Sequence, residues 1–430
     1  MKKVIIPIIL MVSLVLTAWM SYFSKVSSHQ AKVDTLVSEA EHNLDLKVYY
    51  KAMDQYYNLI ELDDGNIDHY HKFMDLAYIT NELDAYESIT LKTIDKFPTD
   101  PKAYKDIINY YMLNNEFVEV QNIALKANEH LEDSSEFREL YFEASYQYSE
   151  IGGRYDSVND FIGFNACVIE DGKWGMINQF GDFILEPIYK HISAFSGGMA
   201  AVSLEDETYF VNKSGHPQLR TKEKVDLAMP FISGLSVIKQ GDKYGYADKD
   251  YNLYEVEWDF ATSYLYGVAA VKKDDKWAIR DFNREYVTEF IFDDVIYDDN
   301  YISSNNGVII ASVDNIYYLF NINGEKIIEN GFEDAKPFSE EGIAPIKVDG
   351  KWGFINTSGD LIIDFIYEDA YAFGIGIAPV KLDDKWFYVD ANNDVMLEGD
   401  FEEARTFSKS GLAAVKVNKD WTYIQLEIYK

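Results

Sequence analysis

The chain has 430 residues, of which 47% are hydrophobic and 15% aromatic, enough apolar material for more than one buried core. Its formal net charge of −34 is spread widely along the chain. No segment is basic enough to follow a phosphate backbone, which argues against nucleic acid as a partner. A cationic partner or a divalent cation remains compatible with this charge.

Residues 4–23 form an uncharged apolar stretch that follows Lys2 and Lys3. In a helix, twenty residues span about 30 Å, the thickness of the hydrocarbon core of a bilayer. A cleaved signal sequence normally has a shorter apolar region, with small residues before the cut. We therefore expect residues 1–29 to be a single-pass membrane anchor, with the bulk of the chain outside the cytoplasm. Secretion after signal cleavage is the alternative.

Residues 30–154 follow a helical pattern. Apolar side chains recur at i, i+3, i+4 and i+7, the spacing that places them on one helix face. The set that begins with Tyr70 recurs 34 residues later, beginning with Tyr104. Between the two sets, Asp100 is a suitable helix N-cap and Pro101 a suitable first helical residue.

This segment resembles the tetratricopeptide repeats, helix-turn-helix units of 34 residues. Tyr70 and Tyr104 stand where that family has its first tryptophan, and Pro98 stands at its proline. Met74 and Ile108 depart from the pattern because they replace its glycine. The resemblance implies a concave peptide-binding surface, and a helical spacer whose aromatic residues form its core is the alternative.

A phrase built around an aromatic anchor recurs eight times in residues 155–430, at intervals of 34, 36, 33, 40, 35, 34 and 35 residues. A fixed period of this size predicts an array of units that bury their apolar faces against their neighbours. We interpret the aromatic anchors as structural, with their rings facing inward; in the second copy Thr208 stands in their place. The anchors are Trp174, Tyr244, Trp277, Tyr317, Trp352, Trp386 and Trp421.

Each unit combines alternating strands with turns at Gly or Asn, residues that tolerate positive φ. An amide or carboxylate follows four residues after the anchor in every copy, and we interpret this column as turn chemistry. A ligand-binding column is the alternative. The column contains Asn178, Asn212, Asp248, Asp281, Asn321, Asn356, Asp390 and Gln425.

The segments Lys173–Gly175 and Lys351–Gly353, with their partner strands, resemble the bacterial WG-repeat family, also called KWG repeats. Ala278, Phe387 and Thr422 replace the family's glycine, so those units could pack or twist differently. The resemblance implies a β-rich interaction module, with no catalytic residues to transfer.

The predicted fold class is therefore α+β and multidomain. Residues 1–29 are the anchor, 30–154 the tetratricopeptide-like helical repeats and 155–430 an all-β repeat array of about eight units. About 35 residues are few for a four-stranded blade, so we expect an open β-solenoid or stacked hairpins. A closed β-propeller is the alternative, and it could use the incomplete first and last units as a clasp.

The sequence offers no chemistry for catalysis. None of the seven histidines has a zinc-binding spacing, and Cys167 lies in an alternating strand, as a small core residue does. Phosphate-binding and dinucleotide-binding motifs are missing, and no acidic cluster has the EF-hand pattern. We expect no enzyme activity, no cofactor and no metal site.

The longest interval between anchors contains an irregular insert, residues 293–307, which is the best candidate for a specific binding loop. We expect a scaffold that binds proteins, with surface carbohydrate or cell-wall binding as the alternative and hydrolysis by acidic loops as a third possibility. The candidate binding residues are Asp293, Asp294, Tyr297, Asp298, Asp299 and Tyr301.

Overall fold

The computed structural model describes residues 2–220 and 223–430, and for residues 2–15 and 219–220 it describes the backbone alone. The chain divides into two compact units, Met1–Ser145 and Tyr146–Lys430. The division falls nine residues before the expected end of the helical segment at 154, because Tyr148–Tyr155 form a strand of the second unit.

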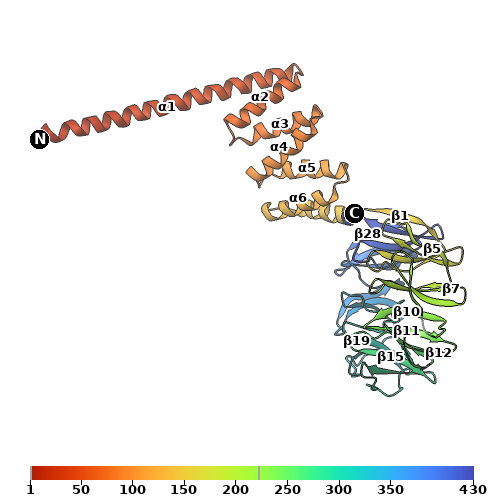
Figure 1. Cartoon of the computed structure of the whole chain (residues 1–430). Helices are drawn as coiled ribbons and strands as arrows, with labels where there is room; N and C mark the ends of the chain where they lie inside the picture. Colours follow the sequence, from red (N-terminus) through yellow and green to blue (C-terminus); the bar gives the residue numbers. More distant parts are fainter. Residues whose placement is uncertain (1, 221–222) are drawn as a thin grey trace. The chain divides into compact units, whose positions relative to one another are not determined.

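The first unit is built of helices, drawn in red to orange in Figure 1. Helix α3 begins at Ile67 and α5 at Pro101, 34 residues apart, and α4 and α6 begin at Leu83 and Phe117 with the same offset. The described helices are α1 (Lys2–Asp45), α2 (Tyr49–Leu62), α3 (Ile67–Ile79), α4 (Leu83–Lys96), α5 (Pro101–Leu113), α6 (Phe117–His130) and α7 (Ser135–Ser145).

The repeated helices arise from the features that the sequence shows. Tyr70 and Tyr104 are completely buried at equivalent places in α3 and α5. Asp100 caps α5 by accepting hydrogen bonds from the backbone N–H groups of Lys102 and Ala103, and Pro101 is the first helical residue. The 34-residue helical repeat is therefore present, while its assignment to the tetratricopeptide family stays a prediction.

The prediction of a single-pass membrane anchor at residues 4–23 requires correction. Among the helices that the structure describes, none is long and apolar enough to cross a membrane. Residues 4–23 are the first part of α1, which continues without a break through polar residues to Asp45. The side chains of residues 4–15 of this stretch lie outside those that the structure describes.

In the second unit, the described strands form eight antiparallel sheets, which we call blades 1 to 8 in chain order. Blade 1 contains β2 (Ser157–Val158), β3 (Asn165–Glu170), β4 (Lys173–Asn178) and β5 (Phe183–Tyr189); blade 2, β6 (His191–Ile192), β7 (Met199–Leu204), β8 (Glu207–Asn212) and β9 (Pro217–Arg220); blade 3, β10 (Leu227–Ile232), β11 (Leu235–Gln240), β12 (Lys243–Asp248) and β13 (Leu253–Trp258); blade 4, β14 (Phe260–Ala261), β15 (Val268–Lys273) and β16 (Lys276–Asp281).

Blade 5 contains β17 (Asp294–Val295), β18 (Ser304–Asn305), β19 (Val308–Val313) and β20 (Ile316–Asn321); blade 6, β21 (Asp334–Ala335), β22 (Ile343–Val348), β23 (Lys351–Asn356) and β24 (Leu361–Tyr367); blade 7, β25 (Asp369–Ala370), β26 (Ile377–Leu382), β27 (Lys385–Asp390) and β28 (Val395–Phe401); blade 8, β29 (Glu403–Ala404), β30 (Leu412–Val417), β31 (Asp420–Leu426) and the earlier strand β1 (Tyr148–Tyr155). A short 3-10 helix, Glu427–Tyr429, follows β31.

The ring closes in blade 8. Strand β1 pairs antiparallel with β31, in a register that places Tyr148 opposite Leu426 and Tyr155 opposite Trp421. The earliest strand of the unit therefore lies beside the latest ones, as the yellow and blue ribbons of Figure 1 show. Because β30 and β31 also pack on blade 1, the eight described blades form a closed β-propeller. The predicted open solenoid is wrong, and the alternative propeller is confirmed.

The hydrophobic core consists of layers between neighbouring blades. A β-strand alternates its side chains between two faces, so one strand supplies two layers. In β3, Ala166 and Val168 face blade 8, where they pack with Leu412 and Tyr423, whereas Cys167 faces blade 2. Every blade thus depends on both neighbours for its core.

In blades 3 and 6, the outer strand comes close to the glycine that follows the anchor. A Cβ atom added to Gly353 would lie 2.7 Å from the carbonyl oxygen of Ile363, and one added to Gly245 would lie 2.7 Å from that of Tyr254. Blade 4 lacks a described fourth strand, and there Ala278 follows the anchor instead. Packing within the blade therefore explains the glycine of blades 3 and 6, while the four-stranded blades 7 and 8 carry Phe387 and Thr422 at this position.

Candidate interaction surface

The insert of blade 5 interrupts the first strand of that blade. Strands β17 and β18 both pair with β19: Val295 lies opposite Ala311, and Ser304 lies opposite Ile309. The backbone N–H of Ile296 still donates a hydrogen bond to the carbonyl oxygen of Ile310. The residues at this position in other blades make the same hydrogen bond to their second strand. Residues 297–302 are therefore an excursion of the chain between two halves of one strand.

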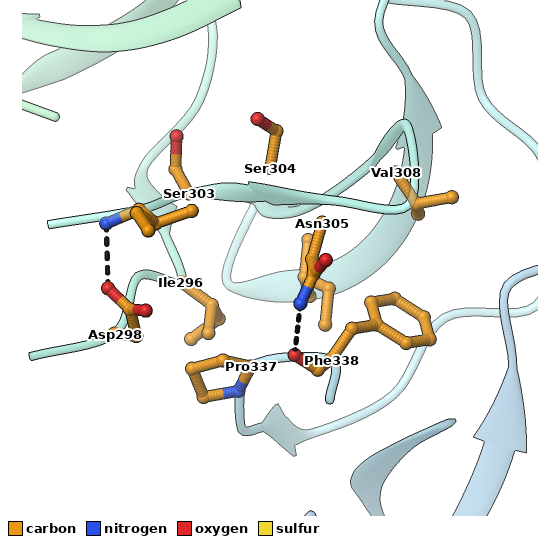
Figure 2. Close-up of a pocket in the computed structure, with 10 residues that line it drawn as sticks. Ile296, Asp298, Ser303, Ser304, Asn305, Val308, Pro337 and Phe338 are labelled. Carbon is orange, nitrogen blue, oxygen red and sulfur yellow. Dashed lines mark hydrogen bonds between the residues drawn. The ribbon is translucent and has the colours of Figure 1, made fainter. Parts of the chain in front are cut away.

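Hydrogen bonds attach this excursion to both neighbouring blades. In blade 4, the N–H of Ser263 donates to the carbonyl oxygen of Tyr301 over 2.6 Å, and its hydroxyl donates to that of Asn300 over 2.9 Å. Toward blade 6, the Asn305 side-chain amide donates to the carbonyl oxygen of Phe338 over 2.8 Å, as Figure 2 shows. The insert is thus a fixed part of the ring.

The structure separates the six predicted site residues into four places. Asp293 accepts a hydrogen bond from Lys276 and one from the N–H of Asn315, at the start of the first strand of blade 5. Asp294, in β17, accepts from the Tyr317 hydroxyl at 2.7 Å. Both carboxylates are occupied by contacts of the propeller itself, and their role in binding stays a prediction.

Tyr297 and Tyr301 belong to an aromatic cluster. Tyr297 stacks on Phe260 of blade 4 with ring centroids 5.0 Å apart, and Tyr301 lies 4.8 Å from the same ring. Phe260 in turn contacts the anchor Trp277. These tyrosines therefore fix the insert to blade 4, and Tyr297 also remains partly exposed at the surface.

Asp298 closes the tip of the excursion with a hydrogen-bonding pattern that recurs in the propeller. Its Oδ1 atom accepts from the N–H groups of Asn300 and Ile302, two and four residues later. Asn178 does the same with Phe180 and Asp182. Seven of the eight residues of the column that the sequence shows therefore act in turns, whereas the eighth, Gln425, lies within β31. The insert contains one more such turn (Figure 2).

Asp299 interacts electrostatically with Asp160 of blade 1 and Arg405 of blade 8. Blades 1 and 5 are opposite each other in a ring of eight, so groups from both can approach only near its axis. One carboxylate oxygen of Asp160 and the Nε atom of Arg405 are buried there without a hydrogen-bond partner among the described residues. The ring centre thus holds a cluster of charged groups, which the sequence analysis did not identify because its members are far apart in the chain.

Burial is the main cause of the raised pKa values of two carboxylates in and beside this cluster. Desolvation raises the pKa of Asp160 to about 6, Arg405 opposes this rise, and Asp299 and Asp298 add to it. Desolvation likewise raises the pKa of Asp298 to about 6, against the hydrogen bonds from Ile302 and Asn300. Asp160 and Asp298 are half-buried, so each keeps some contact with solvent. Their pKa values rise because protein surrounds the carboxylates on several sides.

Two cavities of the propeller are very small. The one beside the insert, lined by Asp298, Ser303, Asn305 and Phe338 among others, has a volume of about 20 Å³ (Figure 2). Another, between blades 3 and 4, measures about 10 Å³. A single water molecule needs roughly 10–15 Å³. Neither cavity can enclose a substrate, and within the described residues no group of three or more metal-binding side chains occurs.

The two rims of the ring differ in chemistry. We call the rim that carries the turns between the second and third strands the acidic rim. In seven described blades, the carboxylate side chain just before the first strand accepts a hydrogen bond from a backbone N–H group of this turn. Blade 2 has Lys190 at the position of the carboxylate. The pairs are Asp156 with Gly172, Asp226 with Gly241, Asp259 with Asp274, Asp293 with Asn315, Glu333 with Gly350, Glu368 with Asp384 and Glu402 with Lys419.

The opposite rim carries the insert and exposed aromatic side chains on several loops. Phe164 and Phe180 of blade 1 and Phe282 of blade 4 lie in or beside its turns and are largely exposed. Arg284 also lies on this rim, beside the small cavity between blades 3 and 4. No sequence motif indicated this arginine, although Arg280 and Arg284 are two of only six arginines in the chain.

Comparison with known proteins identifies the repeats. The family description "WG containing repeat" matches residues 174–207, 253–277, 319–352, 352–386 and 386–421. The C-terminal region therefore contains WG repeats, as its resemblance predicts. No curated protein matches the chain.

Solved structures with a similar chain path include Kluyveromyces lactis Hsv2, which is 10% identical with a TM-score of 0.36, covering 64% of this chain and 100% of that chain. The Neurospora crassa Pan2 WD40 domain is 10% identical with a TM-score of 0.34, covering 65% and 95%. A eukaryotic initiation factor is 10% identical with a TM-score of 0.39, covering 65% and 85%. Scores this low support no argument, so the propeller assignment rests on strand pairing.

Proposed function

We propose that the propeller of WG repeats is a non-catalytic module that binds other proteins, and that the helical repeats extend the same scaffold. The observation that carries this proposal is the closed ring with cavities of about 20 and 10 Å³. Such cavities leave no room for a small-molecule substrate, whereas the turns of both rims offer broad surfaces. Small rigid repeats that present loops are suited to macromolecular contacts.

The insert is the part of the rim that we propose contributes most to partner choice. Its residues 297–302 have no counterpart in the other blades, and hydrogen bonds to blades 4 and 6 hold it in one conformation. A loop fixed in this way loses little conformational freedom on binding, which favours affinity. Tyr297 offers a partly exposed aromatic surface for such a contact.

Site-specific photo-cross-linking tests the proposal in cells that produce the full chain. A photoreactive phenylalanine analogue replaces Tyr297 or Phe180 on the insert-bearing rim, and Asp349 on the acidic rim. We expect at least one position to give a discrete cross-linked protein that is the same in repeated experiments. The absence of any cross-linked protein from all three positions would contradict the proposed protein binding. Turnover of a peptide or glycan substrate by the purified chain would contradict the proposal that the module is non-catalytic.

Carbohydrate or cell-wall binding is the second candidate function. The exposed rings of Phe164 and Phe180 favour it, because sugars stack on aromatic surfaces. No described tryptophan of the second unit is exposed, which weighs against it. Retention of the chain on immobilised polysaccharides, lost on Phe180→Ala, would support this function; equal retention of both proteins would reject it for this ring.

A further inference from the structure

The small cavity between blades 3 and 4 has an unusual lining. Aromatic rings and charged groups meet there: Tyr254 and Glu255 come from β13, and Tyr264, Phe282 and Arg284 from loops of blade 4. The rings of Tyr264 and Phe282 are in edge contact, with centroids 5.2 Å apart. This cavity opens on the same rim as the insert.

A buried ion pair builds this lining. Arg280 is 2% exposed and donates two hydrogen bonds to the Glu255 carboxylate, at 2.8 and 3.1 Å. It donates another, at 3.0 Å, to the carbonyl oxygen of Arg284. Glu255 has a φ of +51°, in the left-handed region that non-glycine residues rarely adopt. The ion pair therefore uses the whole carboxylate and fixes the turn that presents Arg284.

The polar groups of the cavity that remain available are hydrogen-bond donors. Tyr254 already donates to Asp248 over 2.6 Å. The Tyr264 hydroxyl is buried with no hydrogen-bond partner in the part of the chain that the structure describes. Burial raises the pKa of this phenol to about 12, so it keeps its proton. Arg284 lies over the ring of Tyr254 at 4.7 Å and forms no ion pair with any described carboxylate. An acceptor with negative charge would satisfy both donors.

The size of the cavity and its surroundings indicate what carries this acceptor. About 10 Å³ admits little more than one oxygen atom, so the body of the ligand must lie outside. Outside, Phe282 and Tyr286 are about half exposed, at 50% and 51%, and offer apolar surface to a longer chain. The chain as a whole carries a formal net charge of −34, and Arg284 is one of only six arginines in it.

We propose that this cavity is a docking pocket for a protein partner, in which Arg284 and Tyr264 bind the side-chain carboxylate of an Asp or Glu in an extended peptide segment. Apolar residues beside that acid cover Phe282 and Tyr286. The inference rests on the proposed protein-binding function and adds to it the chemical class of the recognised segment.

A library of random twelve-residue peptides, displayed on phage and selected on the full chain, provides the probe. We expect the enriched peptides to contain Asp or Glu beside an apolar residue. Their affinity, measured by fluorescence anisotropy, should fall tenfold or more with Arg284→Gln, since a hydrogen bond between two charged groups is lost. Tyr264→Phe should weaken the same peptides without changing the ring that lines the cavity.

A double-mutant cycle makes the test specific. Replacing the acidic residue of the peptide by its amide should reduce the binding free energy about as much as Arg284→Gln does. Both changes together should reduce it little more than either change alone. Arg154→Gln, an exposed arginine on β1 with the same change of charge, is the matched control and should leave affinity unchanged. Equal melting temperatures of the variants confirm that they fold.

Three results would overturn the proposal: no enriched peptides, peptides without an acid, or acidic peptides that tolerate Arg284→Gln as well as Arg154→Gln. Peptides that bind elsewhere on the ring would still be consistent with a protein-binding propeller. Failure of the cross-linking experiment, in contrast, would remove the proposed function whatever peptides this cavity accepts.

Discussion

The hydroxyl of Tyr423, in the last strand of blade 8, donates a hydrogen bond of 2.7 Å to the carbonyl oxygen of Asn159, 264 residues earlier in blade 1. Tyr388 makes the same contact with Arg405 at 2.9 Å, and Tyr246 makes it with Thr262 at 3.0 Å, each to the following blade. The contact between blades 8 and 1 thus repeats one between blades that are consecutive in sequence. Closure therefore uses the ordinary interface between blades.

We expect Tyr423→Phe to destabilise the second unit by about 1–3 kcal/mol, because it leaves the Asn159 carbonyl buried without a partner. Tyr388→Phe should have an effect of similar size. Tyr266→Phe, at a half-exposed tyrosine, is the control and should have little effect. Thermal unfolding measures all three. If Tyr423→Phe were as harmless as the control, blades 8 and 1 would not be in native contact.

Asp298→Asn should stabilise the chain at neutral pH but not at acid pH. The pKa of Asp298 is raised to about 6, above the value near 3.9 of an unfolded chain. The native state thus binds more protons between these values, and stability falls as pH rises through this window. Asparagine keeps the hydrogen-bond acceptor for the turn and has no charge to bury. We therefore expect the free energy of unfolding to increase by on the order of 1 kcal/mol at pH 7.

Asp248→Asn is the control for this experiment because Asp248 forms the same type of turn. The hydrogen bond from Tyr254 lowers the pKa of Asp248 to about 2, so ionisation stabilises the native state as pH rises above that value. Its amide variant should therefore lose stability at pH 7. Melting temperatures of both variants from pH 4 to 8 check the opposite signs, and changes of the same sign would reject this assignment.

Gly353→Ala should cost about 1–3 kcal/mol through overpacking, because the added methyl group would meet the backbone of β24. Gly65→Ala is the matched control, since a Cβ atom there meets nothing within 4 Å. Denaturant unfolding of the two variants gives the comparison. An unchanged stability of Gly353→Ala would show that the glycine of the Lys-Trp-Gly phrase has another purpose.

Iodide should quench mainly the fluorescence of Trp19, which is 64% exposed, whereas the anchors Trp352, Trp386 and Trp421 are buried. In the variant Trp19→Phe, the accessible fraction of the emission should therefore nearly disappear. Stern–Volmer plots of both proteins at equal ionic strength measure it. A large accessible fraction in the variant would mean that the anchors face solvent and are available to stack on a ligand.

Part of the candidate site could be predicted from the sequence. The long interval between Trp277 and Tyr317 located the insert, because six additional residues in one copy disturb an otherwise regular period. The positions of its residues could not be inferred in the same way. Asp298 and Asp299 are adjacent in sequence, yet the first caps a turn and the second interacts with blades 1 and 8.

The sequence by itself determined the repeating unit of this protein. Period, strand alternation and the turn residues are local properties, and the Lys-Trp-Gly phrase follows from contacts within one blade. Tertiary structure decided that the array closes, because closure depends on the angle between successive blades and on the pairing of β1 with β31. It also decided which distant groups meet at the axis, and that Arg280 and Glu255 fix the turn that presents Arg284.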